Sequence, residues 1–167
     1  MNNRMKALSL GALALVVMQL LPVERSNPPA DGPLVIQDPV VADIVERACS
    51  DCHTHDTSWP WYARVAPVSW WVADHVAEGR EHLNFSVWQG QTAERRDHKL
   101  EEVVEYVEER EMPLRSYMLG HPEARITDQE REVLIRWANG LRGELGVAAS
   151  SGEDEGHDEE GEPGERP

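Results

Sequence analysis

Apolar residues recur at helical spacing along much of the chain, whereas no segment shows the alternating pattern of a strand. The clearest case begins at Asp38-Pro39, where an aspartate that can cap a helix precedes a proline suited to the first helical position. One apolar face follows, made of Val40, Val41, Ile44, Val45 and Ala48. This segment predicts a helix that ends at Cys49, and the whole pattern predicts an all-α fold.

Three more helices are predicted, over residues 67–83, residues 95–110 and from Thr127 to residues 140–143. Thr127 and Glu130 have the spacing of a capping box. Gly79 interrupts the first of the three and permits close approach of a neighbouring backbone or ring. The residues expected to face inward are Val68, Trp71, Val72, Val76 and Leu83 in the first, Leu100, Val103, Val104 and Val107 in the second, and Val133, Leu134, Trp137, Ala138 and Leu141 in the third.

The amino end has the pattern of an export signal. Arg4 and Lys6 precede residues 7–23, which carry no charge. Without a clear cleavage site, we expect residues 1–23 to remain as a membrane anchor, which places the domain on the periplasmic side of the cytoplasmic membrane. Cleavage, giving a soluble periplasmic protein, is the alternative. Residues 24–37 are predicted to be a linker, residues 38–145 the folded domain and residues 146–167 a disordered acidic tail.

The formal net charge is -15, and the tail contributes nearly half of it. An acidic chain without a basic patch is poorly suited to nucleic acid, so we expect no nucleic-acid partner. The charge favours solubility, with electrostatic steering of a basic partner as the alternative interpretation.

The candidate chemistry lies in Cys49-Ser50-Asp51-Cys52-His53, which holds the chain's 2 cysteines. Cys-x-x-Cys-His is the attachment signature of c-type haem: the two thiols add across the vinyl groups, and the histidine becomes the proximal iron ligand. A zinc site would need a second pair of ligands, and a redox dithiol would call for a βαβ pattern. We therefore expect one covalent haem c, with Cys49, Cys52 and His53 holding it.

The second axial ligand has more than one candidate in the sequence. Met112 comes at a helix end directly before Pro113, far enough along the chain to reach the opposite face of a haem. A thioether there gives His/Met ligation, which favours reduced iron. His121, before Pro122, is the alternative, and a core methionine is the structural explanation for Met112.

Supporting groups are also predicted. The other ring nitrogen of His53 should donate to a backbone carbonyl, for example in the loop before Pro67. The aromatic residues of segment 54–66 are expected to pack against the porphyrin or in the core. The candidate donors to the haem propionates are Arg64 and Arg80, with Tyr62, Trp59 and Trp70 as neutral alternatives.

Several motifs together resemble the bacterial haem-binding domain family of small exported c-type proteins. They are the Cys49 to His53 motif, Thr57-x-Trp59-Pro60-Trp61-Tyr62, Ala66-Pro67-Val68-Ser69-Trp70, Gly79-Arg80, Asn84-Phe85-Ser86-x-Trp88, Met112-Pro113, Tyr117, His121-Pro122-x-Ala124 and Trp137-Ala138. The resemblance implies a monohaem, cytochrome c-like domain of about four helices with Met112 as distal ligand. Thr54-His55 departs from the Ser-Asn that is common in the family.

These patterns favour an electron carrier with a six-coordinate haem, because no acid-base machinery is visible beyond scattered histidines. A haem-based sensor or peroxidase-like enzyme with an open distal site is the alternative, with His75, His82 or His121 as acid-base group. A third possibility is an interaction protein in which the acidic tail is the working part. The sequence names no redox partner.

Overall fold

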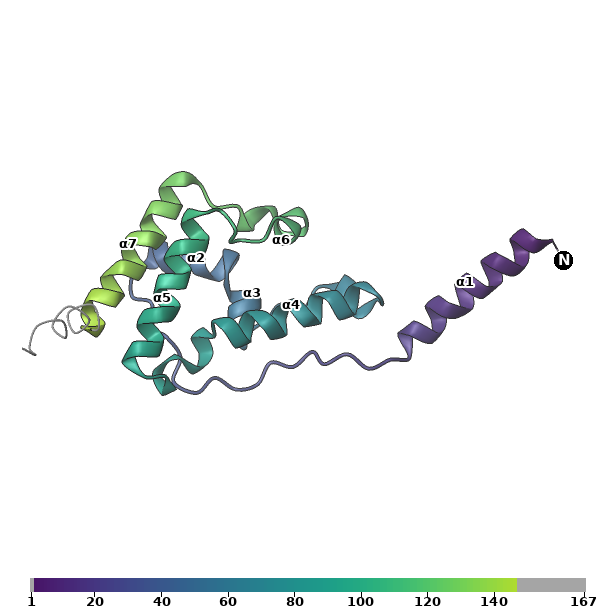
Figure 1. The fold of residues 1–167 in the computed structure, drawn as a ribbon, viewed down its shortest axis with the longest axis horizontal. Coiled ribbons are helices and arrows are strands. Elements are labelled where there is room, and N and C mark those ends of the chain that lie inside the picture. The colour runs from purple at the N-terminus through teal and green to yellow at the C-terminus, as the bar shows by residue number, and fades with distance from the viewer. Residues whose placement is uncertain (1, 147–167) are drawn as a thin grey trace, which may run out of the picture.

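The computed structural model describes residues 2–146, and its secondary structure in that range is entirely helical, with no β-strand, so the all-α prediction is confirmed (Figure 1). Apart from Gly146, the predicted acidic tail lies outside the described residues. The α-helices are α1 (Asn3–Gln19), α2 (Pro39–Ala48), α3 (Ser50–His53), α4 (Val68–His82), α5 (Ala93–Glu108), α6 (Arg115–Gly120) and α7 (Asp128–Leu145). Short 3-10 helices are η1 (Trp61–Arg64), η2 (Phe85–Gly90) and η3 (Pro122–Ala124).

Helices α2, α5 and α7 form the core together with η2. Their buried side chains make one cluster: Val41, Ile44 and Val45 of α2, Phe85 and Trp88 of η2, Leu100 and Val107 of α5, and Leu134 and Ala138 of α7. A fully buried side chain of this size contributes roughly 1.5–3 kcal/mol relative to exposure. The predicted caps are confirmed, because the Asp38 side chain accepts from the backbone of Val40, and Thr127 forms a capping box with Glu130.

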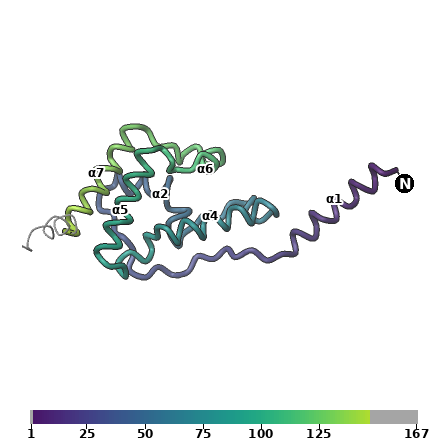
Figure 2. The backbone as a smooth tube through the Cα atoms, in the orientation of Figure 1, coloured from purple at the N-terminus to yellow at the C-terminus, as the bar shows by residue number. Residues whose placement is uncertain are grey.

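Two arms extend from this core. One consists of α3, η1 and α4, and the other consists of Met112, Pro113, α6 and η3 (Figure 2). In the first arm, α3 packs on α4 at Gly79, where an added Cβ would lie 2.8 Å from the backbone oxygen of Cys52. The prediction that Gly79 allows close approach of a neighbouring backbone is therefore confirmed.

The first arm also departs from two expectations. Val68 and Trp71 were expected to face inward, yet they are 42% and 46% exposed. The reason is that α4 uses its second half to pack on α3, while its first turns project beyond the core. Residues 54–66 are not a loop throughout, because they contain η1.

Helix α7 continues past the predicted end at residues 140–143 to Leu145, before Gly146 with φ 68°.

The segment after α1 runs alongside the first arm, and α1 itself projects away from the domain (Figure 1). Helix α1 buries none of its residues, and the extended segment after it runs along the domain to α2 (Figure 1). This linker is tied down by hydrogen bonds: the Asp31 N–H donates to the Ser86 carbonyl, the Leu34 N–H donates to the Phe85 carbonyl, and the Gln89 N–H donates to the Gly32 carbonyl. Among the described helices, none combines the length and hydropathy required to cross a membrane.

Candidate functional site

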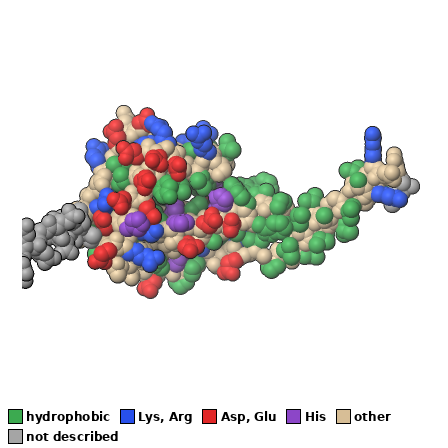
Figure 3. Space-filling view, in the orientation of Figure 1, with side chains coloured by type: hydrophobic (Ala, Val, Ile, Leu, Met, Phe, Trp, Pro, Cys, Tyr) green, Lys and Arg blue, Asp and Glu red, His purple; other side chains and the backbone are tan. Residues whose placement is uncertain are grey.

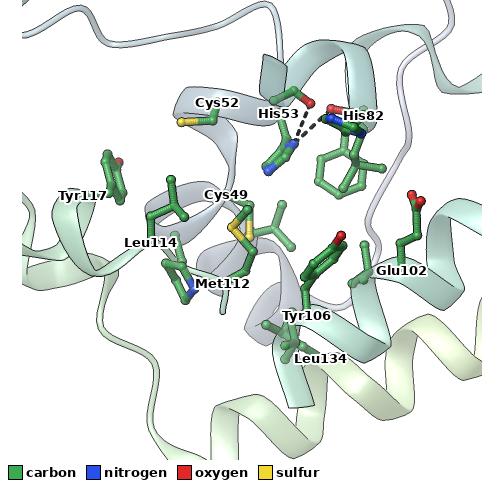
Figure 4. Close-up of a pocket in the computed structure, with 18 of the residues that line it drawn as sticks. Cys49, Cys52, His53, His82, Glu102, Tyr106, Met112, Leu114, Tyr117 and Leu134 are labelled. Atoms are coloured by element: carbon green, nitrogen blue, oxygen red, sulfur yellow. Dashed lines mark hydrogen bonds between the residues drawn. The ribbon is translucent and has the colours of Figure 1, made fainter. Parts of the chain in front are cut away.

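A cavity of about 330 Å³ lies between the core and the two arms, within the usual size range of ligand pockets. Cys49, Cys52 and His53 line it together with Met112, which lies far from them in the chain (Figure 4). The remaining wall is mainly apolar and comes from α2, α4, α5, α6 and α7. Its apolar members are Val45 and Ala48 of α2 together with Leu83, Phe85, Val103, Tyr106, Val107, Pro113, Leu114, Tyr117, Ile126, Leu134 and Trp137.

The end of α4 fixes the orientation of His53. The Nδ1 atom lies 2.9 Å from the carbonyl oxygen of Gly79 and 3.0 Å from that of Leu83. Because both partners are acceptors, the proton lies on Nδ1, and the Nε2 lone pair is free to bind a metal. Burial lowers the pKa of His53 although the two carbonyls oppose that shift, so the imidazole is neutral. The expected carbonyl partner thus comes from the end of α4 and not from the loop before Pro67.

Gly79 therefore has two roles: its lack of a side chain allows close packing on Cys52, and its carbonyl accepts a hydrogen bond from His53. We expect Gly79→Ala to lower the free energy of unfolding relative to Gly140→Ala by about 1–3 kcal/mol, because overpacking costs roughly that much. Both glycines lie within helices, so both variants gain the same helical preference of alanine. An alanine Cβ meets nothing within 4 Å at Gly140. Equal unfolding midpoints in urea for the two variants would contradict the close packing.

The two thiols are neutral at physiological pH. Burial, with a smaller contribution from Cys52, raises the pKa of Cys49 to about 12, and burial together with Asp51 raises the pKa of Cys52 to about 11. A redox-active Cys-x-x-Cys pair needs the opposite shift, since its reactive form is the thiolate. The arrangement therefore gives no support to a dithiol oxidoreductase.

The turn at the end of α5 directs Met112 into the cavity. Arg110 adopts a left-handed conformation with φ 64°, and the N–H groups of Glu111 and Met112 both donate to the Tyr106 carbonyl. A left-handed residue that ends a helix reverses the chain direction. Met112 thus approaches the cavity from the second arm, while His53 approaches from the first (Figure 4).

His121, the alternative ligand, does not line the cavity. Its Nε2 is 2.9 Å from the Tyr62 hydroxyl, and its Nδ1 is 3.1 Å from Glu123. Both ring nitrogens are therefore already engaged in hydrogen bonds. The histidines other than His53 that line the cavity are His75 and His82 of α4.

Two hydrogen bonds join the free ends of the arms, and we call this pair the clasp. The Tyr117 hydroxyl donates to Asp51 Oδ2 over 2.7 Å, and the Tyr62 hydroxyl bonds to His121. The Tyr117 and His121 rings stack with centroids 4.3 Å apart. Burial and the Asp51 carboxyl raise the pKa of Tyr117, which keeps its hydroxyl protonated. The clasp thus connects the attachment motif to the arm that carries Met112.

The predicted propionate donors are not at the cavity. Arg80 donates to the carbonyls of Thr54 and Ser26 and to the Thr57 hydroxyl, so it secures the linker and the segment after the motif. Arg64 is exposed and lies beside the end of α1. The one lysine that lines the cavity is Lys99 of α5, which pairs with Glu102 at 2.8 Å.

The aromatic residues of segment 54–66 do not line the cavity either. Trp61 is 77% exposed, the Trp59 ring N–H donates to Asn27, and Tyr62 belongs to the clasp. Trp70, another predicted donor, also lies away from the cavity. The tryptophan on the wall is Trp137 of α7, which the helical pattern had placed inward.

The donor set fits a haem. An imidazole nitrogen and a thioether face the same apolar cavity from different arms, and two thiols line it beside the imidazole. Fold and site together define an all-helical protein with a cavity suited to a porphyrin. The family model described as haem-binding domain matches residues 13–140. The chain belongs to the haem-binding domain family and is a haem-binding protein. No curated protein and no solved structure matches it.

Proposed function

We propose that the protein is a one-electron carrier of the cytochrome c type. In this proposal one haem is joined covalently to Cys49 and Cys52, with His53 and Met112 as axial ligands. The observation that carries the proposal is that one apolar cavity receives the free Nε2 of His53 and the Met112 side chain from different arms.

The bound haem would supply an iron that cycles between ferric and ferrous. His53 is held by the carbonyls of Gly79 and Leu83, which orients the ring and raises the basicity of its ligating nitrogen. The Met112 thioether favours the reduced state, and the apolar walls exclude water. No proton has to move in such a reaction, so no acid-base residue is needed.

We also propose that the domain works on the periplasmic side of the cytoplasmic membrane. The basic start and the uncharged residues 7–23 support export. Covalent attachment of haem c is completed outside the cytoplasm, which agrees with this location. In the proposal residues 1–23 remain as the membrane attachment.

Optical spectra of the purified protein test the electron-carrier proposal. A six-coordinate His/Met haem predicts a low-spin spectrum in both oxidation states, a methionine-to-iron charge-transfer band, and little binding of carbon monoxide. A high-spin ferric spectrum with ready binding of carbon monoxide would contradict it.

That contrary result would favour a sensor or a peroxidase-like enzyme. His75 and His82 line the cavity and provide the acid-base groups that such a site requires. Peroxide-dependent oxidation of a dye, lost in His75→Ala or His82→Ala, would support this second function.

The clasp gives a further prediction about Met112. Tyr117→Phe keeps the ring that stacks on His121 but removes the bond to Asp51. Because a hydrogen bond to a carboxylate contributes about 1.5–3 kcal/mol, and less where water reaches it, we expect binding of carbon monoxide to become about tenfold faster. Stopped-flow mixing measures that rate.

Tyr106→Phe is the matched control for Tyr117→Phe. Tyr106 also lines the cavity, but it takes no part in the clasp. Equal rates of carbon monoxide binding in the two variants would show that the clasp does not hold the distal arm in place.

A further inference from the structure

Five large apolar side chains are exposed together at the end of the domain nearest α1. Trp61 comes from η1 and Val65 follows it directly, while Val68 and Trp71 come from the start of α4 and Leu119 comes from α6. Leu119 is 83% exposed. We call this set the apolar corner. Figure 3 shows hydrophobic side chains at this end of the domain and continuing onto α1, while acidic and basic side chains gather over the rest of the face.

The apolar corner is a preformed surface. The Ser69 N–H donates to the Val65 carbonyl, which ties the residue directly after η1 to the start of α4. The tip of α6 is close to η1, because a Cβ at Gly120 would lie 3.2 Å from the Tyr62 hydroxyl. The clasp therefore holds the tip of α6, which carries Leu119, close to η1.

The end of α1 is attached to this same corner. The Gln19 amide makes two hydrogen bonds with the backbone of Ala66, donating to its carbonyl over 3.2 Å and accepting from its N–H over 3.0 Å. Arg25 donates to the Ala63 carbonyl over 2.7 Å. The apolar residues of α1 are themselves exposed, namely Leu8, Leu10, Leu13, Leu15, Val16 and Val17.

We propose that the apolar corner rests on the surface of the lipid bilayer that receives α1, with Trp61 and Trp71 among the headgroups. The inference rests on the proposed membrane attachment through residues 1–23 and adds a second contact, made by the folded domain. Tryptophan is enriched at the boundary between hydrocarbon and water, and clustered exposed apolar side chains mark an interaction site.

Continuity with α1 favours lipid over a protein partner. The bonds from Gln19 to Ala66 place the corner where the apolar helix ends, so a bilayer that takes up the helix meets the corner at the same time. Arg64 is exposed within η1 and lies beside the end of α1, where its charge suits a lipid phosphate. The acidic side chains over the rest of the face shown in Figure 3 would be repelled by anionic lipid.

Quenching of tryptophan fluorescence by brominated lipid tests the proposal. The full-length, haem-loaded chain is reconstituted in phosphatidylcholine vesicles, with bromine either absent or placed just below the headgroups. We expect weaker emission in the brominated vesicles. The double variant Trp61→Phe/Trp71→Phe should lose most of this bromine-dependent decrease, while its haem spectrum remains unchanged. Quenching by the haem cancels when the emission in brominated vesicles is divided by the emission in vesicles without bromine.

Trp137→Phe is the control. Trp137 lines the cavity and is not part of the apolar corner, so this variant should keep the bromine-dependent decrease. Flotation of the vesicles reports attachment through α1 independently. A chain that floats but shows no bromine-dependent decrease keeps its attachment and overturns the docked corner. A chain that does not float overturns both. If Trp61 is protected from quenching by the brominated lipid and a dimer forms at the same time, the corner would be a site of self-association, which would also overturn the proposal.

Discussion

Replacing Met112 with alanine is expected to convert a low-spin haem that excludes carbon monoxide into a high-spin haem that binds it nearly stoichiometrically. Met112 is the thioether that lines the cavity, and its backbone is fixed by the turn at the end of α5. Alanine cannot reach the iron, so the sixth position becomes available to water or carbon monoxide. Optical spectra of the ferric and ferrous forms, with and without carbon monoxide, measure this change.

Two controls separate ligation from a general loss of packing. Met118→Ala removes a thioether from α6 that does not line the cavity, and His121→Ala removes the alternative ligand. We expect both to keep the low-spin spectrum. A Met112→Ala protein with the parent spectrum would rule out Met112 as the distal ligand.

The double variant Cys49→Ala/Cys52→Ala is expected to release all of its haem in acidified acetone, whereas the parent protein retains all of it. Both thiols line the cavity beside His53, and they are the chain's 2 cysteines, so no other side chain can form the thioether bonds. Haem staining of a denaturing gel measures the covalent fraction.

The single variants provide the internal comparison. Cys49→Ala and Cys52→Ala each leave one thiol beside the site and should each retain some haem through denaturation. Haem that stays with the double variant after denaturation would contradict covalent attachment through these residues. Loss of haem from the parent protein on denaturation would also contradict covalent attachment.

The longer helices of the domain could be predicted because their signals are local. The aspartate cap at the start of α2, the Thr127-Glu130 box of α7 and the one-sided apolar spacing of α5 all act within a few residues. The Cys49 to His53 motif is equally local, and so its place at the end of a helix followed directly. Met112 could be proposed because a proline follows it immediately.

The parts that could not be predicted depend on contacts between distant residues. The bond from Tyr117 to Asp51 spans 66 positions, and no pattern in the sequence pairs the two. Arg80 was expected at a propionate, but a long side chain with five donors can serve whichever acceptors surround it, and here these belong to the linker and segment 54–66. Trp61 was expected in the interior, yet η1 lies at the end of an arm where little covers it.

The bound linker also sets how far the domain can travel. An electron carrier that is tethered by a flexible linker can move between donor and acceptor, and the distance it can reach grows with the length of the linker. Here hydrogen bonds from Arg80, Asp31 and Leu34 hold the linker against the domain, and Gln19 fixes the end of α1. In the proposed arrangement the domain would therefore keep a fixed position at the membrane and would not move between donor and acceptor. Its electron partners would have to diffuse to it.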